Sequence, residues 1–221
     1  MALNFDGVDD FVDHGDIAAI DGTASLTICM WIKPETLAAA KGIIQKGPAT
    51  GFDVRMKNVS GDLEMRIAAD FHSSTGFFTA NTWVHLAIIY DGSQVADADQ
   101  LKWYKDGVQQ TITFTGAGVP TTIPDSGAAA LIIGGSAGTG GFVDGSIGLV
   151  KIWNAVLTAA QMLQELNSYR PVSTSGLLVW APYDDGTKAV DYSGNGNHGT
   201  VTGALATDGP HVGGGVRPIW S

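Results

Sequence analysis

Two carboxylates stand close enough along this sequence to raise the question of acid–base chemistry. Asp62 and Glu64 are separated only by Leu63, in a segment of strand-forming character. Alternate residues of a strand share a face, and a rise of about 3.3 Å per residue would place the two carboxylates about 7 Å apart. Retaining glycoside hydrolysis needs a pair about 5–5.5 Å apart. We therefore interpret Asp62 and Glu64 as a polar strand face, expect no enzyme activity and assign no catalytic residue.

The histidines and the cysteine do not form a reactive group either. The five histidines, at positions 14, 72, 85, 198 and 211, are scattered, without the His-x-x-x-His or Cys-pair spacing of a zinc site. Cys29, the one cysteine, lies in an apolar run and cannot form an internal disulfide, so we expect a small buried hydrophobe. His85 lies in a core-like strand, and we expect it to be packed there. Gly134-Gly135-Ser136 lacks the residues that complete a phosphate loop.

The composition fits one β-rich domain with an acidic surface. The chain has 221 residues, 44% of them hydrophobic, and 30 glycines that punctuate many short segments. A net charge of -10 repels phosphate backbones, so we expect no nucleic acid partner. No run approaches the roughly 18 apolar residues of a membrane span, so we expect no membrane insertion. The first ten residues, MALNFDGVDD, lack the basic and apolar regions of a signal peptide.

Alternation of apolar and polar residues predicts strands along most of the chain. Residues 26–33 and 83–90 each place four apolar side chains on one face, and Asp106-Gly107 predicts a hairpin between 101–105 and 108–114. Further strands are expected at 42–46, 52–57, 62–68, 130–134, 147–153 and 177–181. About ten to twelve such strands predict an all-β fold, with two antiparallel sheets packed as a sandwich.

One segment has helical spacing. Thr158 is a suitable N-cap, residues 159–169 carry apolar side chains at helical intervals, and Pro171 ends the pattern. We expect one short helix that closes one end of the sandwich.

Six strings of residues occur in the order typical of one family. They lie at 2–12, 25–34, 42–47, 81–87, 103–107 and 145–161, and include Phe5-Asp6-Gly7, Trp31-Ile32-Lys33-Pro34 and Trp83-Val84-His85. Over residues 2–165 they resemble the laminin-G-like, concanavalin A-like lectin/glucanase jelly-roll domains of bacterial and phage proteins. The resemblance implies a jelly roll of two antiparallel sheets.

The end of the chain carries a segment that usually begins this family. Residues 176–180 and the string Asp-Tyr-Ser-Gly-Asn-Gly-Asn-His-Gly-Thr at 191–200 resemble the stretch that precedes the opening strand. We therefore divide the chain into a jelly roll, 1–171, and a C-terminal segment, 172–221. The segment completes its own sandwich by circular permutation, completes a neighbouring subunit, or begins a truncated second domain. Permutation within one chain is the simplest arrangement, because the ends of a domain tend to lie close together.

The resemblance also bears on catalysis and on metal binding. Laminarinase-type glycanases of the superfamily carry Glu-x-Asp-x-x-Glu on one strand, and this pattern is absent here. Many laminin-G-like sandwiches hold a structural Ca²⁺, for which Asp6, Asp9, Asp10 and Asp144 are the candidate ligands. Gly148 stands where the family often has an aspartate, which weakens this expectation. Turn formation by Asp-Gly pairs is the alternative explanation of the same acids.

A sugar site would need an exposed aromatic side chain flanked by polar groups. The candidates are the six tryptophans, at positions 31, 83, 103, 153, 180 and 220, and we expect burial in the core for each. Loops expected at 70–75 and 91–99 are further contact surfaces.

Two functions from different classes fit this sequence. The first is a non-catalytic surface-binding module, glycan-binding or adhesive, at the cell surface or outside the cell. The alternative is a structural virion component, such as a phage capsid decoration or fibre protein, with capsid or tail proteins as partners and no small-molecule ligand. Met1, the missing signal peptide and the unpaired cysteine slightly favour the virion, and self-association is compatible with both.

Overall fold

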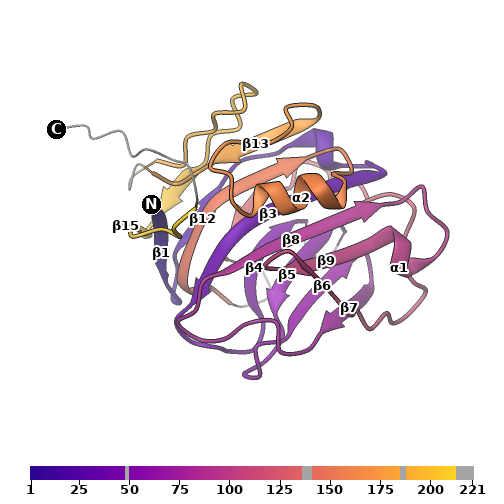
Figure 1. Cartoon of the computed structure of the whole chain (residues 1–221), viewed down its shortest axis with the longest axis horizontal. Helices are drawn as coiled ribbons and strands as arrows, with labels where there is room; N and C mark the ends of the chain where they lie inside the picture. The colour runs from indigo at the N-terminus through magenta and orange to yellow at the C-terminus, as the bar shows by residue number, and fades with distance from the viewer. Residues whose placement is uncertain (48–49, 136–140, 185–187, 213–221) are drawn as a thin grey trace.

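Two antiparallel β-sheets lie face to face in a computed structural model that describes residues 1–47, 50–135, 141–184 and 188–212 (Figure 1). The all-β, two-sheet fold class predicted from the sequence is confirmed. Within these ranges, no helix has the length and apolar character needed to cross a membrane.

The larger sheet has eight strands arranged around a long central strand, β12. The order is β10-β9-β8-β3-β12-β1-β15, and β13 also pairs with β12. On the side of β12 away from β3, β1 pairs with its first half and β13 with its second half. The strands are β1 (Ala2–Asp6), β3 (Ser25–Pro34), β8 (Val84–Asp91), β9 (Leu101–Lys105), β10 (Val108–Gln110), β12 (Asp144–Trp153), β13 (Leu177–Ala181) and β15 (Leu205–Thr207).

The smaller sheet has seven strands, in the order β14-β2-β11-β4-β5-β6-β7. They are β2 (Phe11–Asp13), β4 (Lys41–Lys46), β5 (Phe52–Met56), β6 (Leu63–Ile67), β7 (Asp70–Ser74), β11 (Leu131–Ile133) and β14 (Thr200–Thr202). The expectation of a loop at 70–75 is therefore wrong, because residues 70–74 pair with β6 through the whole of β7.

The hydrophobic core lies between the sheets and follows the predicted alternation. On β3, Leu26, Ile28, Met30 and Ile32 are fully buried in this core. The predicted hairpin is also confirmed, since Lys105 pairs with Val108 across Asp106 and Gly107, both of which have positive φ. Its second strand ends at Gln110, earlier than the predicted residue 114.

A second apolar layer covers the outer face of the larger sheet. It consists of Cys29, Ala87, Ile89, Tyr104, Trp153, Leu157, Met162 and Leu177. Helix α2 (Ala159–Glu165) lies over this face, so the expectation that the helix closes one end of the sandwich is wrong (Figure 1). Cys29 is 1% exposed, as expected, and burial raises the pKa of its thiol.

The helix begins as predicted and ends early. The Thr158 side chain accepts a hydrogen bond from the backbone N–H of Gln161, whose side chain accepts one from the N–H of Thr158, which makes a complete capping box. The helix ends at Glu165, before the predicted residue 169, and beyond it the carbonyl oxygens of Ser168 and Arg170 accept hydrogen bonds from Lys151 of β12. Two further short helices that the sequence did not predict are η1 (Ala18–Ile20) and α1 (Asp97–Gln100).

The C-terminal segment contributes strands to both sheets of its own chain. β13 pairs with β12, β14 pairs with β2, and β15 pairs with β1. The start of the chain therefore lies beside the C-terminal segment in each sheet. The circular permutation of the family order stays a prediction.

Candidate functional site

The carboxylates that could suggest catalysis are engaged in structural contacts. Asp62 accepts hydrogen bonds from the side-chain amide of Asn58 (2.9 Å) and the backbone N–H of Gly76 (2.8 Å). Glu64 accepts two hydrogen bonds from the guanidinium of Arg55, at 2.9 and 2.7 Å. Asp62 also lies just before β6, so the pair does not share a strand. This arrangement leaves neither carboxylate as a ready nucleophile or proton donor.

Arg55 belongs to a row of charges on the outer face of the smaller sheet. Its guanidinium lies 3.6 Å from Asp53 and 5.0 Å from the ring centroid of Phe71. Desolvation by burial raises the pKa of Asp53 above its usual value. Because positive and negative side chains are interleaved within hydrogen-bonding or ion-pair distance, the row reads as a structural network.

Three of the four predicted calcium ligands lie together. One carboxylate oxygen from each of Asp6, Asp9 and Asp10 lies within 4.8 Å of the others, with Asp6 and Asp9 exposed and Asp10 buried. Asp144 is directly opposite Asp6 in the β1–β12 pair, and its carboxylate accepts a hydrogen bond from Thr36 (2.7 Å). The pKa of Asp10 is raised, first by burial and then by repulsion from Asp6 and Asp9.

This chemistry fits a hard cation. The donor atoms are carboxylate oxygens, which Ca²⁺ prefers, and a bound cation would relieve the repulsion among the three acids. Several of the same oxygens also accept backbone hydrogen bonds, such as that from Val8 to Asp6 at 2.8 Å, which is the turn chemistry of the alternative explanation. Calcium binding by Asp6, Asp9, Asp10 and Asp144 stays a prediction.

The tryptophans divide into buried and partly exposed groups. Trp103 and Trp153 are fully buried, as expected. Trp31, Trp83 and Trp180 are partly exposed, and Trp220 lies outside the described residues. The expectation of core burial is therefore wrong for these three, whose side chains keep part of their surface in contact with solvent.

Trp180 is the centre of an aromatic cluster, which we define as Tyr169, Trp180 and Tyr192. The ring centroid of Trp180 lies 5.9 Å from that of Tyr169 and 5.7 Å from that of Tyr192. The guanidinium of Arg170 lies over the Trp180 ring at 5.9 Å. Tyr192 is 49% exposed, so the cluster presents one aromatic side chain to solvent, while the cation lies against the neighbouring Trp180.

A buried ion pair holds one side of the aromatic cluster. Lys151, directly opposite Trp180 on β12, is 2% exposed and pairs with the buried carboxylate of Glu165. The same ammonium donates to the carbonyl oxygens of Ser168 (2.6 Å) and Arg170 (3.4 Å). The backbone around Tyr169 is therefore anchored to β12, and the Tyr169 hydroxyl donates to Asp184 at 2.7 Å.

A buried aspartate holds the other side. The carboxylate of Asp191 accepts four hydrogen bonds: from the N–H groups of Trp180, Ser193 and Asn197, and from the Ser193 hydroxyl. The N–H of Tyr192 donates to the Trp180 carbonyl oxygen at 2.8 Å. We call residues 191–200 the clamp: their hydrogen bonds pair the outer edge of β13 and hold the backbone of Tyr192 beside Trp180.

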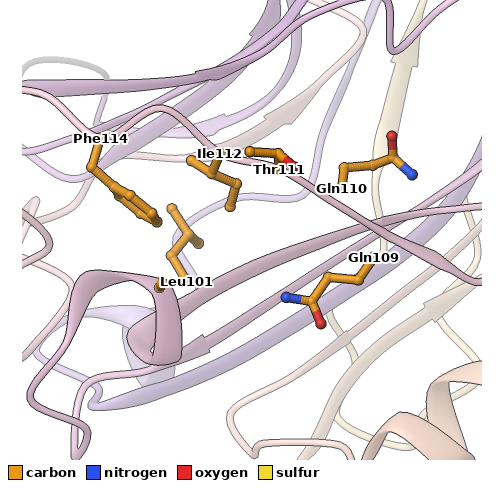
Figure 2. A pocket seen from close by; sticks show the side chains of 7 residues that line it. Leu101, Gln109, Gln110, Thr111, Ile112 and Phe114 are labelled. Atoms are coloured by element: carbon orange, nitrogen blue, oxygen red, sulfur yellow. The ribbon is translucent and has the colours of Figure 1, made fainter.

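A separate pocket of about 300 Å³ lies at the edge of the sandwich next to β10. It is lined by Ala98, Leu101, Gln109, Gln110, Thr111, Ile112 and Phe114, none of which is ionisable. Figure 2 shows Leu101, Ile112 and Phe114 gathered on one side and the amides of Gln109 and Gln110 on the other. The pocket could accept a small neutral ligand. It shares no residue with the aromatic cluster, so variants in the two places can be compared.

The sequence contained only part of the information about the aromatic cluster. Trp180 was a candidate, whereas Tyr169, Arg170 and Tyr192 were missed. The helical pattern extends to Tyr169, Tyr192 lies in a turn-rich string, and no spacing rule connects these positions with Trp180. One available signal was that three of the five tyrosines, Tyr169, Tyr183 and Tyr192, lie in the last quarter of the chain.

Comparisons with known proteins agree with this fold. Residues 6–162 match the family described as the concanavalin A-like lectin/glucanases superfamily, so the aromatic cluster lies outside the matched part. No curated protein sequence matches the chain significantly.

Among solved structures, a Bacteroides ovatus protein to which carbohydrate binding has been ascribed aligns with a TM-score of 0.67 and 16% identity, over 92% of this chain and 58% of that one. The chain therefore spans little more than half of that protein.

Two carbohydrate-binding domains are also similar in fold. The CBM40 domain of the Ruminococcus gnavus IT-sialidase, bound to α2,3 sialyllactose, has a TM-score of 0.53 and 12% identity, over 74% of this chain and 95% of that one. Domain 4 of AbnA, a GH43 extracellular arabinanase from Geobacillus stearothermophilus, in complex with arabinotriose, has a TM-score of 0.50 and 18% identity, over 67% and 69%. These comparisons give the virion alternative no support.

Proposed function

The chain belongs to the concanavalin A-like lectin/glucanases superfamily, and on this basis we propose that it is a non-catalytic module that binds glycans. The observation that carries the proposal is the aromatic cluster of Tyr169, Trp180 and Tyr192 on the outer side of the larger sheet. The carbohydrate-binding domains of similar fold also support glycan binding. At 18% and 12% sequence identity, their similarity to this chain is one of fold.

The aromatic cluster has the chemistry that a sugar needs. The C–H groups of a pyranose ring form an apolar face that packs on an aromatic ring, while its hydroxyl groups need polar partners nearby. A tyrosine supplies both, an apolar ring and a hydroxyl group, and loses little conformational entropy when it is already held in place. Tyr192 is exposed, its backbone is held by a hydrogen bond to Trp180 and its ring packs against the Trp180 ring, so binding would order little of it.

The carboxylates support a role without catalysis. Asp62 and Glu64 are occupied by Asn58, Gly76 and Arg55. A hydrolase would need two carboxylates placed on either side of one glycosidic bond. We therefore expect the protein to bind glycans at the cell surface or outside the cell without cleaving them.

Glycan binding is tested with the full chain on an array of plant, microbial and animal glycans, followed by calorimetry on the best ligand. Tyr192→Ala should weaken the affinity at least tenfold, about 1.4 kcal/mol, because it removes the exposed ring. Phe114→Ala, in the pocket of Figure 2, is the matched control and should leave the affinity unchanged. Reducing-end assays on the same ligand should stay at background.

Circular dichroism first checks that Tyr192→Ala and Phe114→Ala are both folded. Binding that Phe114→Ala abolishes and Tyr192→Ala preserves would move the site to the pocket. A folded protein that binds no glycan on the array would overturn the proposed function. Turnover that disappears in Glu64→Gln would overturn its non-catalytic part.

A further inference from the structure

Arg170 carries a positive charge that no acid among the described residues neutralises. The residue is exposed, and in the part of the chain that the structure describes no carboxylate lies within 4.0 Å of its guanidinium. Arg55 offers the contrast, because its guanidinium stacks on Phe71 and also pairs with Asp53 and Glu64. Arg170 stacks on Trp180 in a comparable way, and its guanidinium makes no hydrogen bond or ion pair with a described residue.

The acids around the aromatic cluster have other partners. Glu165 is buried against Lys151, and the carboxylate of Asp191 accepts four hydrogen bonds. Asp184 accepts the hydroxyl group of Tyr169. The described acids Glu165, Asp184 and Asp191 are therefore engaged with other groups, which leaves the guanidinium of Arg170 for a ligand.

The backbone of Arg170 is also fixed. Its carbonyl oxygen accepts hydrogen bonds from the Ser168 hydroxyl (2.6 Å) and from Lys151 (3.4 Å). Stacking on Trp180 further restricts the planar guanidinium, which suits paired hydrogen bonds to an anion. Tyr192 packs against the same Trp180 ring as Arg170. One ligand could therefore place its sugar ring on Tyr192 and its anionic group on Arg170.

We propose that the aromatic cluster selects anionic sugars, with Tyr192 packing on the sugar ring and Arg170 binding its carboxylate or sulfate group. This inference rests on the proposed glycan-binding function and adds the class of ligand. The net charge of -10 disfavours long-range attraction of a polyanion, so selection comes from contact with Arg170. At physiological ionic strength the repulsion of distant acids is screened beyond about 8 Å.

The experiment compares matched glycans by calorimetry with the full chain. One pair is an oligogalacturonide and its carboxyl-reduced, neutral form, and the other is a sulfated galactan oligosaccharide and its desulfated form. The wild type should bind the anionic member of at least one pair tenfold or more tightly. Which pair shows the preference distinguishes a carboxylate from a sulfate ligand.

Variants then assign the preference to residues. Arg170→Gln should remove the preference and keep the affinity for the neutral member, whereas Tyr192→Ala should weaken the binding of both members. Lys188→Gln removes one exposed positive charge elsewhere in the C-terminal segment and should keep the preference. Thermal unfolding of each variant checks that the fold is intact.

The outcomes separate this inference from the function on which it rests. If the protein binds glycans but shows no anionic preference, or keeps the preference in Arg170→Gln, this inference is overturned and glycan binding stands. If neither pair nor any glycan on the array binds, the proposed function fails, and this inference fails with it.

Discussion

Lys151 and Glu165 form an ion pair that is almost completely shielded from solvent, with side chains 2% and 0% exposed. The pair connects the central strand of the larger sheet to the end of α2, and it lies beneath the backbone of residues 168–170. The Glu165 carboxylate also accepts the N–H of Val172. The backbone positions of Tyr169, in the aromatic cluster, and of Arg170 beside it therefore depend on this ion pair and on the hydrogen bonds that its two side chains make to residues 168–172.

Removing one partner of this pair should be strongly destabilising. Lys151→Met leaves the Glu165 carboxylate buried without its cation, and we expect a loss of about 3–5 kcal/mol in the free energy of unfolding. Urea denaturation followed by tryptophan fluorescence measures the change. The double variant Lys151→Met, Glu165→Leu should recover most of the loss, because it removes both charges. A Lys151→Met protein as stable as the wild type would show that the pair contributes little.

The carboxylate of Asp191 should be as important for the edge of β13. Asp191→Ala removes four hydrogen bonds and leaves the N–H of Trp180 unpaired at a strand edge. We expect a loss of about 2–4 kcal/mol and a greater tendency to aggregate. Asp208→Ala, at an exposed site in the same segment, is the control. Equal unfolding midpoints for the two variants would contradict the clamp.

Calcium should raise the stability of the protein if Asp6, Asp9, Asp10 and Asp144 bind it. A ligand at a hundredfold excess over its dissociation constant contributes about 2.7 kcal/mol, which corresponds to a rise of several degrees in the melting temperature. Scanning calorimetry in millimolar calcium and in excess EDTA measures this shift, with Asp9→Asn expected to reduce it. Magnesium is the control for a non-specific salt effect. Identical melting temperatures in calcium and EDTA would remove the site.

Stability should fall when the pH drops below about 6.5. Burial lowers the pKa of His14, His72 and His85, in the last case to about 3. The unfolded chain binds protons at these histidines below their ordinary pKa of about 6.5, whereas the folded chain does not until a lower pH. Their contribution is therefore complete above pH 6.5 and is lost as the pH falls towards the folded-state values.

Urea midpoints between pH 7.5 and pH 5 test this dependence, since most carboxylates titrate below that range. The raised pKa of Asp53 acts in the opposite direction, so wild type is compared with His85→Gln to isolate one histidine. The variant should show a shallower fall in stability between the two pH values. An equally steep fall would exclude a contribution from His85.

Local sequence patterns determined much of the framework. The alternation in residues 26–32 identified the strand and its core face, and Asp106-Gly107 identified the hairpin, since a strand's side-chain period and a turn's dihedral angles depend on neighbouring residues. Thr158 marked the start of the helix for the same reason. The grouping of Asp6, Asp9 and Asp10 also follows from a short turn.

Only the tertiary structure decided what covers the outer face of the larger sheet. Cys29 and Ala87 are buried on that side because α2 packs over it. The alternation within a strand cannot predict this burial, because the helix lies more than 70 residues further along the chain. Lys151 lies in a run that predicts a strand, but its burial depends on a single carboxylate 14 residues further along. Tyr169, Trp180 and Tyr192 come from a loop, a strand and a turn, so the folded backbone alone brings them together.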